Sequence, residues 1–184
     1  MSEANGRNLD ALVGLPPVLD VCCGPRGMWF DKKDERAMFV DKREMDFGKV
    51  QNGQWLRIAP DRVADFTALP FPDDTFAHVV FDPPHVLGKE WWQGSILLKY
   101  GVLVGDWREM LRKGFAECFR VLRPEGTLIF KWCEVQFPLS DVLALTPEKP
   151  LYGHRGGKAS KTHWVAFMKP NAEHHARPER SERT

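Results

Sequence analysis

Short apolar runs rich in β-branched and aromatic residues alternate along this chain with longer, more polar stretches, and this alternation most restricts its fold. Such runs predict buried strands, and strands joined by long connections predict βαβ units around a largely parallel sheet. We expect strands at residues 18–22, 37–41, 62–65, 78–81, 127–132 and 163–168. The sequence therefore predicts an α/β fold, with a mostly parallel sheet flanked by helices.

One segment between these runs has a clear helical period, from about residue 106 to residue 122. The apolar positions that recur at three- and four-residue steps are Trp107, Met110, Leu111, Phe115, Cys118, Phe119 and Leu122. Asp106 is well suited to cap the first turn, and Pro124 with Gly126 is typical of a helix end. The segment therefore predicts an amphipathic helix.

The length of 184 residues and the hydrophobic content of 43% allow one well-filled core. We expect a single domain over residues 1–170. Residues 171–184 have almost nothing apolar to bury, which predicts a disordered tail. Its two histidines, His174 and His175, are interpreted as solvated, and no metal site is expected.

Cysteine usage and hydropathy indicate a cytoplasmic protein. The four cysteines form no CxxC pair and are typical of reduced, mostly buried residues. No secretory signal is recognisable, and no stretch approaches the roughly 20 apolar residues that span a bilayer, so no membrane partner is expected. The net charge of +1 neither requires nor excludes nucleic acid, because binding depends on where the positive charge lies.

Acidic residues and glycines follow the first three predicted strands in a pattern typical of nucleotide binding. The first strand runs into the sequence DVCCGPRG at residues 20–27, whose two glycines let a ligand approach the backbone closely. Asp41 closes the second strand, where a carboxylate accepts hydrogen bonds from ribose hydroxyls. Asp65 and Phe66 stand at the end of the third strand and offer an acceptor for an adenine amino group beside an apolar ring. A structural turn at the glycines and a local cap at Asp65 are the alternatives.

This arrangement resembles the class I S-adenosylmethionine-dependent methyltransferases, which have a Rossmann-like fold, over roughly residues 15–169. The resemblance implies S-adenosylmethionine as the cofactor. The residues that it implies for cofactor binding are Asp20, Cys22, Gly24, Gly27, Asp41, Asp65 and Phe66. Cys22 departs from the family, because it occupies the place of the first glycine in the first motif.

The fourth predicted strand leads directly into Asp82, Pro83, Pro84 and His85. Prolines have no N–H and cannot continue the ladder, so the chain must leave the sheet in a rigid extended turn. The Asp82 carboxylate and the Pro83 carbonyl are then two acceptors that can bind both hydrogens of an exocyclic amine and later receive its proton. His85 is predicted to stack on the base that carries this amine.

The turn resembles the D/N/S-P-P-Y/F/W signature of methyltransferases that act on N6 of adenine or N4 of cytosine. More broadly, the chain is similar to small phage- and bacteria-associated methyltransferases. The resemblance implies catalytic roles for Asp82, Pro83, Pro84 and His85, on a base taken out of the helix or already single-stranded. Imidazole is smaller than the family's aromatic ring and can carry charge near neutral pH. A cysteine nucleophile is not expected. In enzymes that methylate C5 of cytosine, the nucleophilic cysteine follows a proline of the corresponding motif, whereas here Pro83 is followed by Pro84.

Two later segments, residues 85–105 and 149–164, carry residue types that hold nucleic acid. Aromatic faces with interleaved lysines suit unpaired bases, and a glycine-containing basic loop suits a phosphate backbone. The candidate substrate-binding residues are Trp91, Trp92, Lys99, Arg155, Lys158 and Lys161. A packed lid and a solvated loop are the alternatives.

The preferred hypothesis is methylation of an exocyclic amine on a DNA base. An RNA base is the closest alternative, because the same turn serves both polymers. An amine on a protein or small molecule, and a non-catalytic module that binds S-adenosylmethionine, stay open as well. Because no stretch of the given sequence is long enough to be a separate target-recognition domain, we expect selectivity to come from the two segments above, from a homodimer or from a partner.

Overall fold

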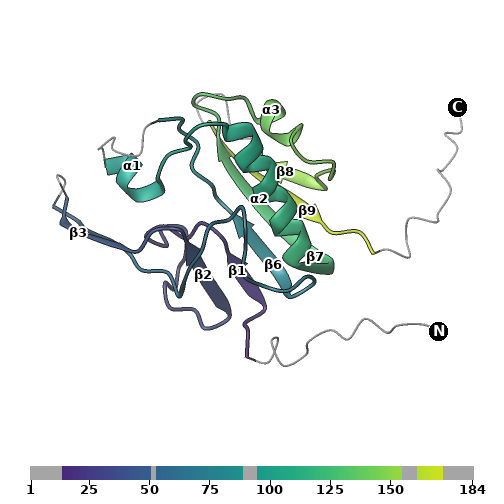
Figure 1. Cartoon of the computed structure of the whole chain (residues 1–184), viewed down its shortest axis with the longest axis horizontal. Coiled ribbons are helices and arrows are strands. Elements are labelled where there is room, and N and C mark those ends of the chain that lie inside the picture. The colour runs from purple at the N-terminus through teal and green to yellow at the C-terminus, as the bar shows by residue number, and fades with distance from the viewer. Residues whose placement is uncertain (1–13, 51–52, 89–94, 155–160, 172–184) are drawn as a thin grey trace, which may run out of the picture.

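The computed structural model describes residues 14–50, 53–88, 95–154 and 161–171 (Figure 1). Its centre is a seven-stranded sheet with the order β5-β2-β1-β6-β7-β9-β8. The strands are β1 (Val18–Asp20), β2 (Ala37–Asp41), β5 (Arg62–Val63), β6 (Phe76–Phe81), β7 (Leu122–Cys133), β8 (Tyr152–His154) and β9 (Thr162–Met168). From β5 to β7 neighbouring strands are parallel, whereas β9 runs antiparallel to β7 and β8. The mostly parallel α/β sheet that the sequence predicts is confirmed.

The predicted strands differ from the observed ones mainly at their ends. β1 stops at Asp20 because the chain turns there, and β5 keeps only two residues. β6 begins earlier than predicted, at Phe76, and β7 begins at Leu122 directly after a helix, because Phe76 and Leu122 pair with each other. β2 has the predicted bounds.

The predicted amphipathic helix is α2 (Trp107–Val121), which lies across one face of the sheet (Figure 1). The Asp106 side chain accepts hydrogen bonds from two backbone N–H groups of the first turn, as the sequence predicts for an N-cap. Buried Leu111 and Phe115 pack into the main core with residues of β6 and β7. The helix ends at Val121, before Pro124, because Leu122 already has extended backbone.

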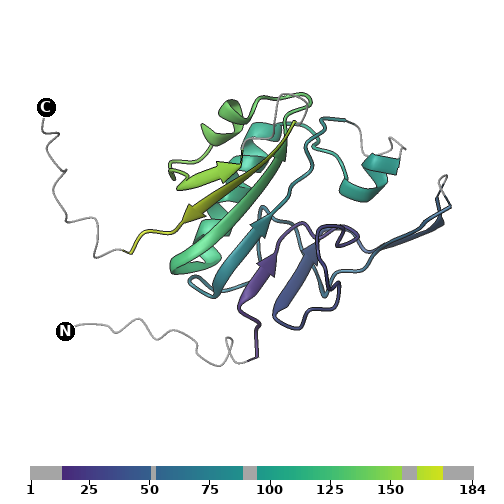
Figure 2. The same cartoon turned by 180° about the vertical axis from the view of Figure 1, so that it is seen from behind.

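The described helices all follow β6 in the sequence, and the other two are short: α1 (Ser95–Tyr100) and α3 (Leu139–Leu143). No described helix is long and apolar enough to cross a membrane. The connection from β1 to β2 consists of turns and carries Trp29, whose ring meets Phe39 edge-on at 4.8 Å. Together with Cys23 and Ala37 these rings form a small second cluster. Figure 2 shows the sheet from the side opposite α2.

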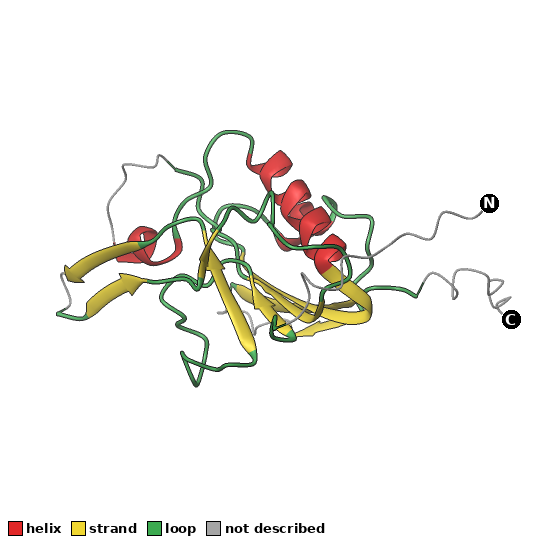
Figure 3. Ribbon diagram, turned by 60° about the horizontal axis from the view of Figure 1, so that its bottom comes forward, coloured by secondary structure: helices red, strands yellow, loops and turns green. Residues whose placement is uncertain are grey.

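A hairpin of β3 (Met45–Lys49) and β4 (Trp55–Ile58) is inserted between β2 and β5 and projects from the body beside α1 (Figure 3). Sequence analysis did not predict it, although Asn52 and Gly53 form the dipeptide most typical of a tight hairpin turn. Leu56 and Ile58 are buried, whereas the alternate residues Trp55 and Arg57 are exposed. The hairpin therefore presents one polar face to solvent next to the sheet edge described below.

Candidate functional site

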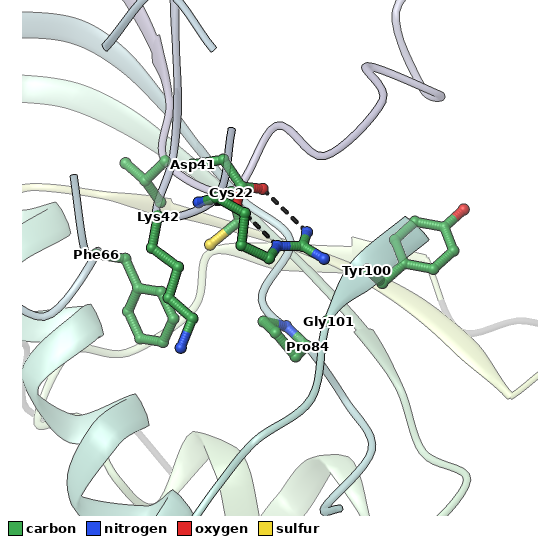
Figure 4. Close-up of a pocket in the computed structure, with 9 residues that line it drawn as sticks. Cys22, Asp41, Lys42, Phe66, Pro84, Tyr100 and Gly101 are labelled. Atoms are coloured by element: carbon green, nitrogen blue, oxygen red, sulfur yellow. Dashed lines mark hydrogen bonds and ion pairs between the residues drawn. The ribbon is translucent and has the colours of Figure 1, made fainter. Parts of the chain in front are cut away.

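The carboxyl ends of β1, β2 and β6 meet at one pocket (Figure 4), as expected for the ligand-binding edge of an open α/β sheet. Its lining residues are Val21, Cys22, Asp41, Lys42, Arg43, Phe66, Pro84, Tyr100 and Gly101. Figure 4 shows Phe66 and Lys42 on one side of the pocket and Pro84 and Gly101 on the other, with Asp41 above them in this view. The structure thus brings Cys22, Asp41 and Phe66, three of the predicted cofactor residues, to the same pocket as Pro84 of the proline turn.

Gly24 and Asp41 tie the glycine turn to the end of β2. The Gly24 N–H donates to Asp41 Oδ2 at 3.0 Å, and Gly24 has a φ of +48°, which favours glycine. A Cβ on Gly24 would lie 3.0 Å from the Lys99 carbonyl oxygen. A side chain at position 24 would therefore be crowded by the chain itself, whereas Gly27 has open space around its Cβ position and does not line the pocket.

Arg43 closes the pocket, and sequence analysis did not identify it. Its guanidinium bonds both oxygens of Asp41, at 3.0 and 3.2 Å, and donates to the carbonyls of Leu98 and Lys99 at 3.1 and 3.2 Å. The space left in the pocket is about 20 Å³, close to what one water molecule needs. Residues 98–101, called here the α1 strap, thus lie over the ends of β1 and β2.

Asp20 stabilises the turn from below. It is fully buried and accepts hydrogen bonds from Trp29 Nε1 at 2.7 Å and from the Cys22 N–H at 3.2 Å. Burial raises the pKa of its carboxyl to about 7, against the lowering effect of these two bonds. Asp20 is therefore a positioning residue for the glycine turn, and it does not line the pocket.

Asp65 and Phe66, predicted together, have different surroundings. Asp65 Oδ1 accepts from the N–H and the hydroxyl of Thr67, at 2.9 and 2.8 Å, which is the local cap considered as its alternative. Phe66 is buried and lines the pocket with Asp41. Phe66 therefore forms an apolar wall of the pocket, whereas one oxygen of Asp65 already accepts hydrogen bonds from Thr67.

The proline turn places Asp82 beside a lysine from the neighbouring strand. Asp82 is 8% exposed, and its Oδ2 lies 2.6 Å from Lys131 Nζ. Burial raises the pKa of Asp82, while the Lys131 charge acts in the opposite direction. Lys131 Nζ also lies 5.7 Å from the Tyr100 ring and 5.6 Å from the Trp164 ring. Sequence analysis did not identify Lys131. Its position as a charged residue between Phe130 and Trp132 in an apolar strand is the signal that could have indicated it.

His85, the last residue of the predicted catalytic turn, stands among aromatic rings. Its ring centroid is 6.2 Å from that of Tyr100 and 6.4 Å from that of Trp132. Burial lowers the pKa of His85 below its usual value, so the neutral ring is favoured near neutral pH. A neutral, half-buried imidazole is suited to stacking.

Of the predicted substrate-binding residues, the structure describes two. Lys99 is the second residue of the α1 strap, and Lys161 is exposed just before β9. Both therefore lie at the same sheet edge as the pocket. The others, Trp91, Trp92, Arg155 and Lys158, lie outside the described residues, as does nearly all of the predicted tail.

The donor set of the pocket fits an adenosyl group. Asp41 offers a carboxylate at the end of β2 for ribose hydroxyls, Gly24 leaves room that a side chain would fill, and Phe66 supplies an apolar wall. Arg43 and the α1 strap occupy that room in this structure. No group of three potential metal ligands occurs among the described residues.

Comparison with known proteins supports the fold. No family model matches the chain, and no curated protein matches it in sequence. The PH0226 protein of Pyrococcus horikoshii OT3 aligns with a TM-score of 0.55 and 17% identity, over 84% of this chain and 81% of that one. The N-methyltransferase NodS of Bradyrhizobium japonicum WM9 gives 0.51 and 12%, over 89% and 92%. A TehB-like SAM-dependent methyltransferase of Corynebacterium glutamicum gives 0.51 and 14%, over 88% and 84%. The chain therefore has the Rossmann-like fold of S-adenosylmethionine-dependent methyltransferases.

Proposed function

We propose that this protein transfers a methyl group from S-adenosylmethionine to an exocyclic amine of a nucleic-acid base, with DNA favoured over RNA. One observation carries the proposal: Pro84 of the Asp82-Pro83-Pro84 turn lines the same pocket as Asp41. A pocket suited to an adenosyl group thus adjoins a turn suited to an amine. The methyltransferase fold is consistent with both.

The cofactor half of the site would be formed by Asp41, Gly24 and Phe66. Asp41 would accept hydrogen bonds from ribose hydroxyls once Arg43 had released its oxygens, and Phe66 would pack against the adenine ring. When bound, S-adenosylmethionine supplies an electrophilic methyl group on a positively charged sulfur. The α1 strap has to move for binding, because the Lys99 carbonyl lies against Gly24.

The amine half of the site would be formed by Asp82 and the Pro83 carbonyl. An exocyclic amine of adenine or cytosine is a weak nucleophile because its lone pair is delocalised into the ring. Two acceptors that bind its hydrogens localise that lone pair on nitrogen, and the Asp82 carboxylate then takes up the released proton. Lys131 favours the ionised form of Asp82, which the buried position otherwise disfavours.

The test compares the wild type with Asp82→Ala and with Asp141→Ala, a matched change at an exposed aspartate. Each is expressed in a host without its own base methylases, and DNA and RNA are digested separately for mass spectrometry of nucleosides. We expect N6-methyladenine or N4-methylcytosine in DNA with the wild type and Asp141→Ala, and none with Asp82→Ala. A methylated base found in RNA alone would identify RNA, instead of DNA, as the substrate.

A mark that persists with Asp82→Ala, or no mark with the wild type in either pool, would contradict the proposal. Because Asp82→Ala leaves Lys131 without its partner, its thermal unfolding and its affinity for S-adenosylmethionine are measured alongside. Loss of the mark counts only if both show a folded protein that binds the cofactor.

A further inference from the structure

A basic hollow lies on the exposed face of the β3–β4 hairpin. It encloses about 410 Å³ between the hairpin and the glycine turn. Its lining residues are Gly24, Pro25, Arg26, Lys32, Lys33, Trp55, Arg57 and Ala59. The sequence analysis assigned no role to its four cationic residues or to Trp55.

Three of the four cations in this hollow have no side-chain partner in the part of the chain that the structure describes. Arg26 is held in place, since it pairs with Asp61 at 2.7 Å, donates to two backbone carbonyls and lies 3.8 Å from the Phe39 ring. Lys32, Lys33 and Arg57 are exposed, and their side chains form no ion pair or hydrogen bond with any described residue. Arg26 therefore stabilises the wall, while the other three direct positive charge to solvent.

Two nearby carboxylates, Asp31 and Asp46, offset only part of the positive charge of Lys32, Lys33 and Arg57. Asp31 accepts from the Lys33 backbone N–H, and Asp46, opposite Arg57 in the hairpin register, accepts from the Gly48 N–H. Lys49 adds a further cation on the same face of the hairpin, because it pairs with Trp55 across the two strands. The face therefore keeps a net positive charge, which favours a polyanion.

The exposed ring of Trp55 indicates which kind of polyanion this face binds. It is 71% exposed, although its strand neighbours Leu56 and Ile58 are buried, so it contributes little to the core. An exposed indole between unpaired cations matches the arrangement that binds single strands, with a base stacked on the ring and phosphates on the cations. An acidic protein segment would use the cations and leave the ring without a stacking partner.

The hollow and the pocket lie on either side of one turn. Gly24 lines the hollow, and its N–H bonds Asp41, which lines the pocket. Cys22, two residues earlier, also lines the pocket. A single strand with phosphates at the hollow would therefore need to cross only this turn to reach the pocket that Pro84 lines.

We propose that the hairpin hollow binds the phosphate backbone of single-stranded nucleic acid, with one base stacked on Trp55. The identity of this ligand as a substrate rests on the function proposed above. The hollow provides an anchoring surface on the cofactor side of the site, separate from the two segments that the sequence indicated.

The test measures binding of a labelled single-stranded oligonucleotide by fluorescence anisotropy, without cofactor. Trp55→Ala is expected to weaken binding on the order of 10-fold. Arg57→Gln is expected to reduce the slope of log K against log salt by about 0.7, the contribution of one phosphate contact on a single strand. The matched control is Arg123→Gln, an exposed arginine at the start of β7, at the opposite edge of the sheet, and it should bind like the wild type.

Wild-type affinity in both Trp55→Ala and Arg57→Gln would overturn the proposal, as would competition by polyglutamate equal to that by unlabelled oligonucleotide. Because binding is measured without cofactor, the two proposals fail separately. Trp55-dependent binding without any methylated base would overturn the proposed function and keep the surface. Methylation with unaltered binding in both variants would overturn the surface and keep the function.

Discussion

Replacing Lys131 with methionine removes the one cation found bonded to Asp82 in the described part of the chain, while an unbranched stem of similar length is kept. Nζ and Oδ2 are 2.6 Å apart, and the side chains of Lys131 and Asp82 are 21% and 8% exposed. Removing one partner of such a buried pair costs about 3–5 kcal/mol if the remaining charge persists. We take about 3 kcal/mol as the cost where Asp82 stays ionised.

The cost depends on pH, because Asp82 can avoid it by taking up a proton. Burial raises its pKa in the folded protein, and Lys131 opposes that increase. A carboxyl with a raised folded-state pKa holds a proton that the unfolded chain has released, so the free energy of unfolding falls as the pH rises through that range. Without Lys131 the range extends to higher pH. Lys131→Met should therefore be destabilised more at alkaline than at acidic pH.

The assay is thermal unfolding of wild type and Lys131→Met at about pH 5 and about pH 8. About 3 kcal/mol corresponds to a Tm lower by roughly 6–12 °C for a domain of this size, and we expect that at the higher pH. The control is Lys113→Met, a 60% exposed lysine whose 3.8 Å ion pair with Glu109 is on the surface of α2. The charge of His85 also lowers the pKa of Asp82, but His85 is present in every variant. An equal loss of Tm at both pH values would show that the cost does not depend on the ionisation of Asp82.

Arg43→Ala is expected to tighten binding of S-adenosylmethionine on the order of 10-fold by titration calorimetry, because two hydrogen bonds that hold the α1 strap, about 0.5–1.5 kcal/mol each, are lost and Asp41 is freed. Arg36→Ala, which breaks an exposed pair with Asp34, should leave affinity unchanged, and weaker binding by Arg43→Ala would contradict the prediction. The free energy of unfolding should also fall as the pH rises from about 4 to about 7, since the Asp20 pKa is raised from 3.8 to about 7 and the folded protein keeps its proton. Asp20→Asn should flatten that part of a denaturation series, and an unaltered pH dependence would show that another group is responsible.

The sheet was predictable because its strands are short apolar runs whose periodicity differs from that of α2. The ends of β6 and β7 were not, since they depend on pairing between Phe76 and Leu122, far apart in the sequence. The β3–β4 hairpin escaped prediction because half of its residues are exposed and only the Asn52-Gly53 dipeptide marks its turn.

The backbone of the candidate site was predictable from motifs, and the side-chain partnerships were not. Gly24, Asp41 and the proline turn stand at strand ends, and parallel pairing brings strand ends together. The bond between Lys131 and Asp82 joins residues 49 positions apart and follows only from the register of β6 and β7. At Asp65 the local alternative could be read from the sequence, because a short carboxylate can accept a hydrogen bond from a backbone N–H two residues later, here that of Thr67.

The proposed reaction transfers a methyl group to an exocyclic amine at the Asp82 turn. The most direct measurement incubates purified protein and methyl-labelled S-adenosylmethionine with two single-stranded oligonucleotides. One contains adenine and cytosine, and in the other hypoxanthine and uracil replace them, so that those amino groups are absent. We predict label in the first oligonucleotide only, and none in either with Asp82→Ala. Equal labelling of both oligonucleotides, or labelling of the first by Asp82→Ala at the wild-type rate, would contradict the proposed reaction.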